Sequence, residues 1–241
     1  MKHIGILAHS FEGATLCFRT ACLEGVKHSG PHMHPHITMT CSPMGLVLEA
    51  WDRGDNQKPR AFFMEDARRL AAAGCDFFAC PDNTAHIALE SEGEPFPIPG
   101  LHIGEVVAEQ AKRDGRAKVG ILGTKYTMTG PVYPGALGRR GLRWAVPDEA
   151  DRKVIDDIIF DELCLGTFTD DARKAYVRII DKLKADGCDA VALVCTEIPL
   201  LITQDVSPLP ILDSTRLLAA AVVEVALGDK AMPEWRGGPV G

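Results

Sequence analysis

Short apolar runs separated by polar, helix-like segments predict an α/β protein. The run at 190–194 is bounded by a small-residue turn and stops abruptly at Cys195, and similar runs occur at 3–8 and 117–122. Short apolar runs between turn signals are typical of buried strands in a parallel sheet. Ligands of such sheets bind at the carboxyl ends of the strands. The polar residues that follow each run are therefore the candidate functional positions.

The same patterns predict the remaining elements. Further strands are expected at 37–40, 101–103 and 210–212, with another that ends at Cys80. Helices are expected at 15–28, 64–73, 104–112, 147–164, 169–185 and 216–227. The polar segment 51–60 is expected to be a loop, with an active-site lid as one interpretation, and the tail from Met232 is expected to fray.

Two short sequence repeats indicate an internal duplication. Gly-Cys-Asp occurs at 74–76 and 187–189, an offset of 187 − 74 = 113, and Gly-Ile-Leu occurs at 5–7 and 120–122, an offset of 120 − 5 = 115. Two matches at nearly one offset suggest a repeated α/β unit of a little over 110 residues. We expect two pseudo-symmetric lobes, each a mostly parallel sheet flanked by helices.

The expected domain boundaries follow from the duplication. The N-terminal lobe would span 1–113 and the C-terminal lobe 114–210, while 211–241 would pack back across both lobes. The repeat places Asp82 opposite Cys195 at the ends of equivalent strands. If the lobes face each other, these two side chains would flank one active site.

Composition narrows the class of protein. The 241 residues are 46% hydrophobic and 24% charged, which is ordinary for a globular enzyme. The net charge of −7 argues against non-specific nucleic-acid binding, and no apolar run reaches the ~18 residues of a membrane span. The chain begins almost directly with a strand, so we expect no signal peptide. The eight scattered cysteines then indicate reduced thiols in the cytoplasm.

Each candidate position also has an ordinary structural interpretation. Cys195 could be an inert buried thiol, since free cysteine is among the most buried residue types, and Asp82 could be only a helix N-cap. The polar loop that includes Ser10 suits anion binding at the start of the next helix, but Ser10 or Thr15 could simply cap that helix. The loop has neither a dinucleotide fingerprint nor a P-loop, so no nucleotide site is expected.

Three histidines imitate a metal site. His32, His34 and His36 alternate along the chain, a spacing that could place them on one face of a strand. Pro31 and Pro35 favour an irregular entry to the strand instead. No further ligand is close in sequence, and no metal or other cofactor is expected.

Several motifs in order closely resemble the aspartate/glutamate racemase family. They are Asn-Thr-Ala-His at 83–86, Leu-Gly-Thr-Lys-Tyr-Thr-Met at 122–128, Pro-Asp-Glu at 147–149 with Asp-Glu-Leu-Cys-Leu-Gly at 161–166, and Cys-Thr-Glu-Ile-Pro-Leu-Leu at 195–201. The resemblance runs from Gly5 to about Thr215. It implies two α/β halves, a cofactor-free site between them, a small carboxylic-acid or amino-acid substrate, and a homodimer or higher homo-oligomer.

One position departs from the family pattern. Family racemases carry Cys immediately before Asn-Thr-Ala-His, where this chain has Asp82, so only Cys195 keeps the thiol. In a two-thiol racemase one thiolate removes the Cα proton and the opposite thiol delivers another. A thiol with a pKa near ~8.5, lowered by a helix N-terminus, suits that task. A carboxyl with a pKa near ~3.9 is a weak base, and Asp82 would serve only if burial raised its pKa.

Three functions are therefore considered. The chain could be an amino-acid racemase or epimerase in which Asp82 and Cys195 act on opposite faces of Cα. It could be a divergent family member that hydrolyses, isomerises or decarboxylates a small acid. It could also be a non-catalytic protein that binds a small acid.

The resemblance further implies which residues bind the substrate. Donors beside the two catalytic positions would hold its carboxylate: Ser10, Asn83, Thr84, Thr124 and Thr196. Glu197 and His86 are expected to orient the catalytic groups rather than to act as bases. Arg53 and Lys125 are candidates for contacting a substrate side chain.

Overall fold

The computed structural model describes residues 1–240, and contacts between residues divide the chain into two compact units. The first unit contains Met1–Ile103 together with the segment from Thr215 onward, and the second contains Gly104–Ser214. The sequence places the corresponding boundaries at 113 and 210. The helix that follows Ile103 belongs almost entirely to the second unit, and the last helix almost entirely to the first.

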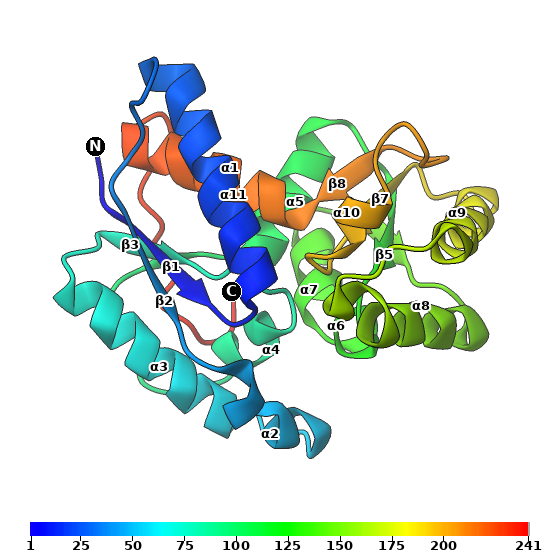
Figure 1. Cartoon of the computed structure of the whole chain (residues 1–241), viewed down its shortest axis with the longest axis horizontal. Coiled ribbons are helices and arrows are strands. Elements are labelled where there is room, and N and C mark those ends of the chain that lie inside the picture. The colour runs from blue at the N-terminus through cyan, green and yellow to red at the C-terminus, as the bar shows by residue number, and fades with distance from the viewer. Residues whose placement is uncertain (241) are drawn as a thin grey trace. The chain divides into compact units, whose positions relative to one another are not determined.

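The first unit is built on a four-stranded parallel sheet with the order β2-β1-β3-β4. Its strands are β1 (Ile4–Ala8), β2 (Ile37–Cys41), β3 (Phe77–Ala79) and β4 (Gly100–Leu101). Its helices are α1 (Phe11–Ser29), α2 (Leu48–Asp52), α3 (Gln57–Ala72), α4 (Ala85–Leu89) and α11 (Ser214–Leu227), with a 3-10 turn η1 (Met44–Leu46). In Figure 1, α3 lies on one side of these strands and α1 lies with α11 on the other.

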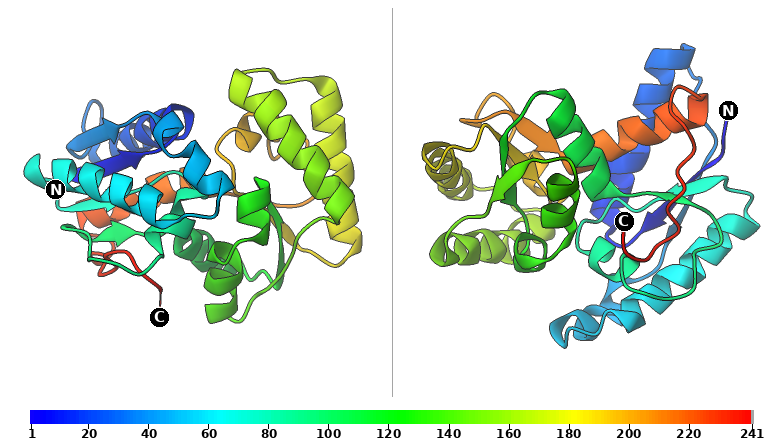
Figure 2. Two further views of the ribbon diagram at one scale, coloured as in Figure 1. Left: turned by 90° about the horizontal axis from the view of Figure 1, so that it is seen from below. Right: turned by 180° about the vertical axis from the view of Figure 1, so that it is seen from behind.

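The second unit repeats this plan with the strand order β6-β5-β7-β8, again parallel throughout. Its strands are β5 (Lys118–Leu122), β6 (Arg143–Ala145), β7 (Ala190–Leu193) and β8 (Ile211–Asp213). Its helices are α5 (Ile103–Arg113), α6 (Lys125–Thr129), α7 (Val132–Arg139), α8 (Glu149–Asp161), α9 (Asp170–Ala185) and α10 (Ile198–Leu201), with a 3-10 turn η2 (Leu163–Leu165). The long helices α8 and α9 lie side by side (Figure 2). The expected α/β class, with two parallel sheets flanked by helices, is confirmed.

The repeated Gly-Cys-Asp tripeptide has a structural role in both units. Gly74 and Gly187 adopt positive φ angles of 81° and 83°, which ends α3 and α9 in a conformation that glycine adopts without strain. Asp76 Oδ2 then accepts from the backbone N–H of His3 at 2.7 Å, and Asp189 Oδ2 accepts from that of Ala117 at 2.7 Å. The carboxylate thus fastens the start of one strand to the start of its neighbour. Both units use the tripeptide to end a helix and to join the starts of two strands, which explains why it recurs.

Each unit has its own apolar core between sheet and helices. In the first unit, Phe63 and Leu70 of α3 pack with Leu7 and Phe78 of the sheet. In the second unit the core is formed by buried residues of α8, α9 and β7, among them Ile155, Ile159, Tyr176, Ile179, Val191 and Leu193. These cores fix the strands, and hence the loops at the strand ends. Within the described residues, no helix combines the length and the apolar character needed to cross a bilayer.

Several element predictions need correction. The segment 51–60 is not a loop, because it contains the end of α2 and the first turn of α3. Helix α1 begins at Phe11 rather than at Thr15, because the side chain of Ser10 accepts from Gly13 N–H and starts the helix earlier. The α8 helix stops at Asp161 and continues only as η2. The sequence analysis gives no prediction for the short elements β6, α6 and α7, which have only three, five and eight residues.

The tail from Met232, expected to fray, is bonded to the first unit at residues 235–238. Backbone N–H groups of Phe96 and Gly100 donate to the carbonyls of Arg236 and Trp235, both at 2.8 Å, and Gly238 N–H donates to Leu89 O at 2.8 Å. Its glycines suggested a mobile end, but the partly buried Trp235 indole packs near Phe78 and near two histidines of the first unit. The aromatic anchor therefore outweighs the flexible composition.

Candidate active site

The strand registers place the candidate residues at equivalent positions in the two units. In the first unit, Ile6 pairs with Ala79, and three residues further along the chain come His9, just after β1, and Asp82, in the loop after β3. In the second unit, Leu122 pairs with Leu193, and two residues further along the chain come Thr124 and Cys195, each just beyond its strand. Neighbouring strands lie about 4.8 Å apart. Each unit therefore presents one pair of polar side chains where two central parallel strands end.

Asp82 lies in the middle of the loop between β3 and α4 and is partly buried. Its Oδ1 accepts from the backbone N–H of Ala85 at 2.9 Å. Asp82, and not Thr84, is therefore the side chain that caps this short helix. One carboxylate oxygen is thereby held in a defined direction at the end of the sheet.

His86 supports the Asp82 loop from within the core. Its ring is fully buried, Nδ1 lies 2.8 Å from the carbonyl oxygen of Asp82, and Nε2 accepts from Ile103 N–H at 3.2 Å. Because Nε2 accepts, Nδ1 carries the hydrogen and donates to Asp82. Burial, followed by the charge of nearby His102, holds the pKa of His86 well below its usual value. His86 is therefore uncharged, and its hydrogen bond to the Asp82 carbonyl stabilises the loop between β3 and α4.

Cys195 lies in the second unit, two residues beyond the last residue of β7, and its side chain contacts a carboxylate. Its Sγ donates to Glu197 Oε2 at 3.0 Å, and Glu197 is only 5% exposed. Burial raises the pKa of Cys195 well above its ordinary value, and the charge and hydrogen bond of Glu197 raise it further. The expected lowering by a helix N-terminus is wrong, because α10 has only four residues and the backbone bond from Glu197 is a smaller effect. The thiol is therefore protonated at neutral pH.

A buried tyrosine lies near this thiol–carboxylate pair. Tyr176 of α9 is fully buried, and its hydroxyl finds no hydrogen-bond partner among residues 1–240. Burial raises the pKa of Tyr176 well above its usual value, and the charges of Cys195 and Glu197 add to this rise. The charged neighbours that act on the pKa of Cys195 are acidic, which favours the S–H form.

The remaining predicted binding residues lie beside these positions. Ser10 Oγ caps α1 through the N–H of Gly13 at 3.2 Å. Thr124 is buried, and its Oγ1 accepts from the N–H of Thr127 at 3.3 Å, so it caps α6. Asn83 and Thr196 are buried next to Asp82 and Cys195, and Thr84 is partly buried. All five are therefore at the carboxyl ends of the central strands of their own unit.

The two basic candidates for a substrate side chain have other partners. Arg53 Nη2 lies 2.5 Å from Glu49 Oε2 in an exposed pair at the end of α2. The Lys125 ammonium lies 4.9 Å from the centre of the Tyr126 ring. Neither contact points to a preference for a particular substrate.

Sequence reasoning missed one residue of the first unit. His9, directly before Ser10, is only 4% exposed and accepts from the indole N–H of Trp51 through Nε2 at 3.3 Å. The available signal was its position at the end of the first strand. The contact with Trp51 of α2 leaves no trace in the sequence, because the two residues are 42 positions apart.

The three alternating histidines take part in local packing. His36 stacks on His3 with ring centres 4.0 Å apart, and His34 Nδ1 lies 2.9 Å from the carbonyl oxygen of Pro35. His32 has a positive φ of 65°. Over residues 1–240, no group of three His, Cys, Asp or Glu side chains is placed to hold a metal ion.

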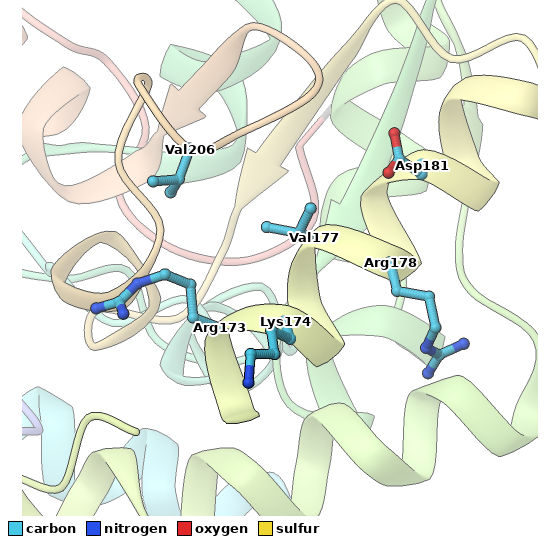
Figure 3. A pocket seen from close by; sticks show the side chains of 6 residues that line it. All are labelled: Arg173, Lys174, Val177, Arg178, Asp181 and Val206. Atoms are coloured by element: carbon cyan, nitrogen blue, oxygen red, sulfur yellow. The ribbon is translucent and has the colours of Figure 1, made fainter. Parts of the chain in front are cut away.

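A surface pocket of about 590 Å³ lies elsewhere in the second unit, against α9. Val177 points toward Val206 across the pocket, while Arg173 and Arg178 extend away from it in opposite directions (Figure 3). None of the predicted site residues lines it. The pocket is therefore separate from the strand ends that carry Thr124 and Cys195.

Comparison with known proteins gives a consistent result. The family model described as Asp/Glu/hydantoin racemase matches residues 7–222. The broad specificity amino-acid racemase RacX of Bacillus subtilis (strain 168) is 23% identical over 195 residues, which cover 80% of this chain and 83% of that protein.

Solved structures agree with the family match. A candidate Asp/Glu racemase from Yersinia pestis superimposes with a TM-score of 0.84 at 30% identity, over 94% of this chain and 100% of that one. An aspartate racemase homologue from Pyrococcus horikoshii OT3 superimposes with a TM-score of 0.76 at 27% identity, over 94% of this chain and 100% of that one. Similarity to these proteins extends over nearly the whole chain.

Proposed function

Because this chain belongs to the Asp/Glu/hydantoin racemase family, we propose that it is a cofactor-independent racemase or epimerase of a small amino acid. Membership of this family implies an isomerase-type enzyme with a small amino-acid substrate. The observation that carries the proposal is the equivalent position of Asp82 and Cys195, one in each of two units with the same strand order. A racemase needs two groups that exchange a proton with opposite faces of one carbon.

We assign different resting states to the two groups. The Cys195 thiol keeps its hydrogen beside Glu197, so it is the resting proton donor. Asp82 then removes the Cα proton and becomes a carboxylic acid, while the carbanion takes the hydrogen of Cys195 and leaves a thiolate. In the opposite direction the thiolate removes the proton and the Asp82 carboxyl returns one. Both directions conserve protons and need no redox partner.

The roles of the surrounding residues follow from their contacts. His86 fixes the Asp82 loop and Glu197 aligns the thiol of Cys195, so both are positioning residues. Donors at the strand ends would bind the substrate carboxylate: Ser10, Asn83, Thr84, Thr124 and Thr196. The three proteins named above are described as a racemase, a candidate racemase and a racemase homologue, which favours proton transfer at Cα over the hydrolytic and decarboxylating alternatives.

An exchange experiment tests this function. Incubation of the enzyme with each common amino acid in heavy water should give Cα deuteration of at least one, together with formation of its enantiomer. The breadth of the panel matters, because the Bacillus relative is described as a broad specificity racemase. No deuteration of any amino acid by folded enzyme would refute the proposal. Light scattering after gel filtration would test the homodimer that the family resemblance implies.

A further inference from the structure

One ring nitrogen of His9, the residue directly after β1, lacks a hydrogen-bond partner among the described residues. His9 Nδ1 is buried and has no hydrogen-bond partner within residues 1–240. Buried polar atoms in proteins are nearly always paired, because leaving one unpaired is costly. Nδ1 therefore needs a hydrogen-bond partner that residues 1–240 do not supply.

The contact with Trp51 decides which kind of partner is needed. The indole N–H can only donate, so His9 Nε2 must be the acceptor of their 3.3 Å bond. A neutral imidazole that accepts at Nε2 carries its hydrogen on Nδ1. The orphaned atom is therefore an N–H donor, and the missing partner is an acceptor.

The imidazole ring is also held in place. Phe63 meets it edge-on, with ring centres 5.1 Å apart and planes at 88°, and Trp51 meets it at 6.1 Å and 61°. Both aromatic residues come from α2 and α3, which pack against each other. The direction of the Nδ1–H bond is thus fixed by the fold before any ligand arrives.

The position of His9 suggests what the acceptor is. His9 directly follows β1, and Asp82, the proposed base, lies in the loop after the neighbouring parallel strand β3, so both are at the edge of the sheet where ligands of parallel sheets bind. We propose that His9 is a substrate-binding residue whose Nδ1–H donates to a carboxylate oxygen of the small acid, with Trp51 fixing the tautomer. The identity of the substrate rests on the proposed function, whereas the binding of a carboxylate does not.

Two substitutions separate this role from simple packing. His9→Asn keeps an N–H donor near the place of Nδ1 but cannot reach Trp51, whereas His9→Gln can accept from Trp51 but places no donor at the Nδ1 position. Calorimetric binding of L-aspartate, L-glutamate and succinate would be measured in a Cys195→Ser background, where turnover cannot disturb the result. For the tightest of these ligands we expect His9→Gln to weaken binding by about tenfold or more, and His9→Asn by about threefold or less.

The outcomes keep the two proposals distinct. Equal losses in both variants, or no loss in either, would overturn the role of His9 and leave the racemase proposal standing. If His9→Gln weakens succinate binding but the enzyme deuterates no amino acid at Cα, the role of His9 stands and only the racemase proposal is overturned. If His9→Gln does not fold, NMR of the native protein labelled with ¹⁵N-histidine decides. The His9 signal should show a protonated Nδ1 and shift on addition of the bound acid, and a protonated Nε2 would contradict the proposal.

Discussion

The thiol of Cys195 donates a hydrogen bond to Glu197 Oε2 at 3.0 Å, and the acceptor is a carboxylate that is almost completely buried. Two negative charges at this distance would repel each other strongly, because Glu197 is buried, so the pair keeps one proton between sulfur and carboxylate. The arrangement stabilises the thiol in its donor form and orients it. It also means that Cys195 is not the activated thiolate that its sequence context suggests.

Replacement of Glu197 by Gln should separate reactivity from catalysis. Without the carboxylate, the pKa of Cys195 should fall, because the charge and hydrogen bond that raise it are lost. Alkylation by iodoacetamide at pH 7.5 should therefore become faster, by about tenfold for each unit of pKa lost. Racemisation should become slower, because the thiol is no longer aligned.

The exposed Cys41 of the first unit provides the internal control for that measurement. Alkylation would be followed at each cysteine by mass spectrometry of peptides, and the rate at Cys41 should not change between the two proteins. An unchanged rate at Cys195 would mean that Glu197 does not govern its proton.

Asp82→Asn tests the carboxylate of the first unit with little structural change. Asn caps helices about as well as Asp, so the bond from Ala85 N–H should survive and the free energy of unfolding should change by less than about 1 kcal/mol. An amide cannot remove a proton, so Cα deuteration in heavy water should fall by at least about 100-fold. If Asp82→Asn lowers the free energy of unfolding but leaves Cα deuteration unchanged, Asp82 serves only as a helix cap.

Alkaline pH should weaken the fold through a different thiol. Cys17 of α1 is fully buried, and burial raises its pKa to about 12. Above pH ~8.5 the unfolded thiol loses its proton while the folded one keeps it. The folded state then binds more protons, so the free energy of unfolding falls as pH rises, by up to about 1.4 kcal/mol per pH unit until the folded pKa is reached.

Urea unfolding between pH 8 and pH 11 would measure this slope. Cys17→Ala should make the alkaline decline shallower, although it lowers stability at pH 8 through the loss of buried volume. Cys41→Ala, at an exposed position, should leave the slope unchanged. An identical decline in all three proteins would show that Cys17 is not the group responsible.

The strands could be predicted from sequence because their burial leaves a plain apolar run, as at 190–193. Repetition of Gly-Cys-Asp also predicted the duplicated plan, and the matching strand orders bear this out. The contacts that could not be predicted include one that is distant in sequence, between Trp51 and His9. The contact of Glu197 with Cys195 is local, but it depends on the backbone turn after β7, which the residue pattern does not specify.

The docked tail is the clearest case of such a distant contact, and it leads to a testable consequence. Trp235 stacks near His86, with ring centres 6.0 Å apart, and meets His102 at 4.9 Å. His86 in turn donates to the carbonyl of Asp82. Trp235→Ala should therefore lower stability by about 1–3 kcal/mol, since it removes a partly buried aromatic side chain, and should also loosen the loop that carries Asp82.

Thermal unfolding, limited trypsin digestion and exchange kinetics would check both effects together. The variant should be cut sooner after Arg236, because the backbone bonds that hold the tail lose their anchor. The rate at which the variant deuterates the substrate at Cα should fall several-fold. Trp235→Phe should restore much of this rate, because it keeps an aromatic ring in place. Met232→Ala, in an exposed part of the same tail, is the matched control and should behave like the parent protein. If Trp235→Ala becomes more sensitive to trypsin with unchanged exchange, the tail supports the fold but not the position of Asp82.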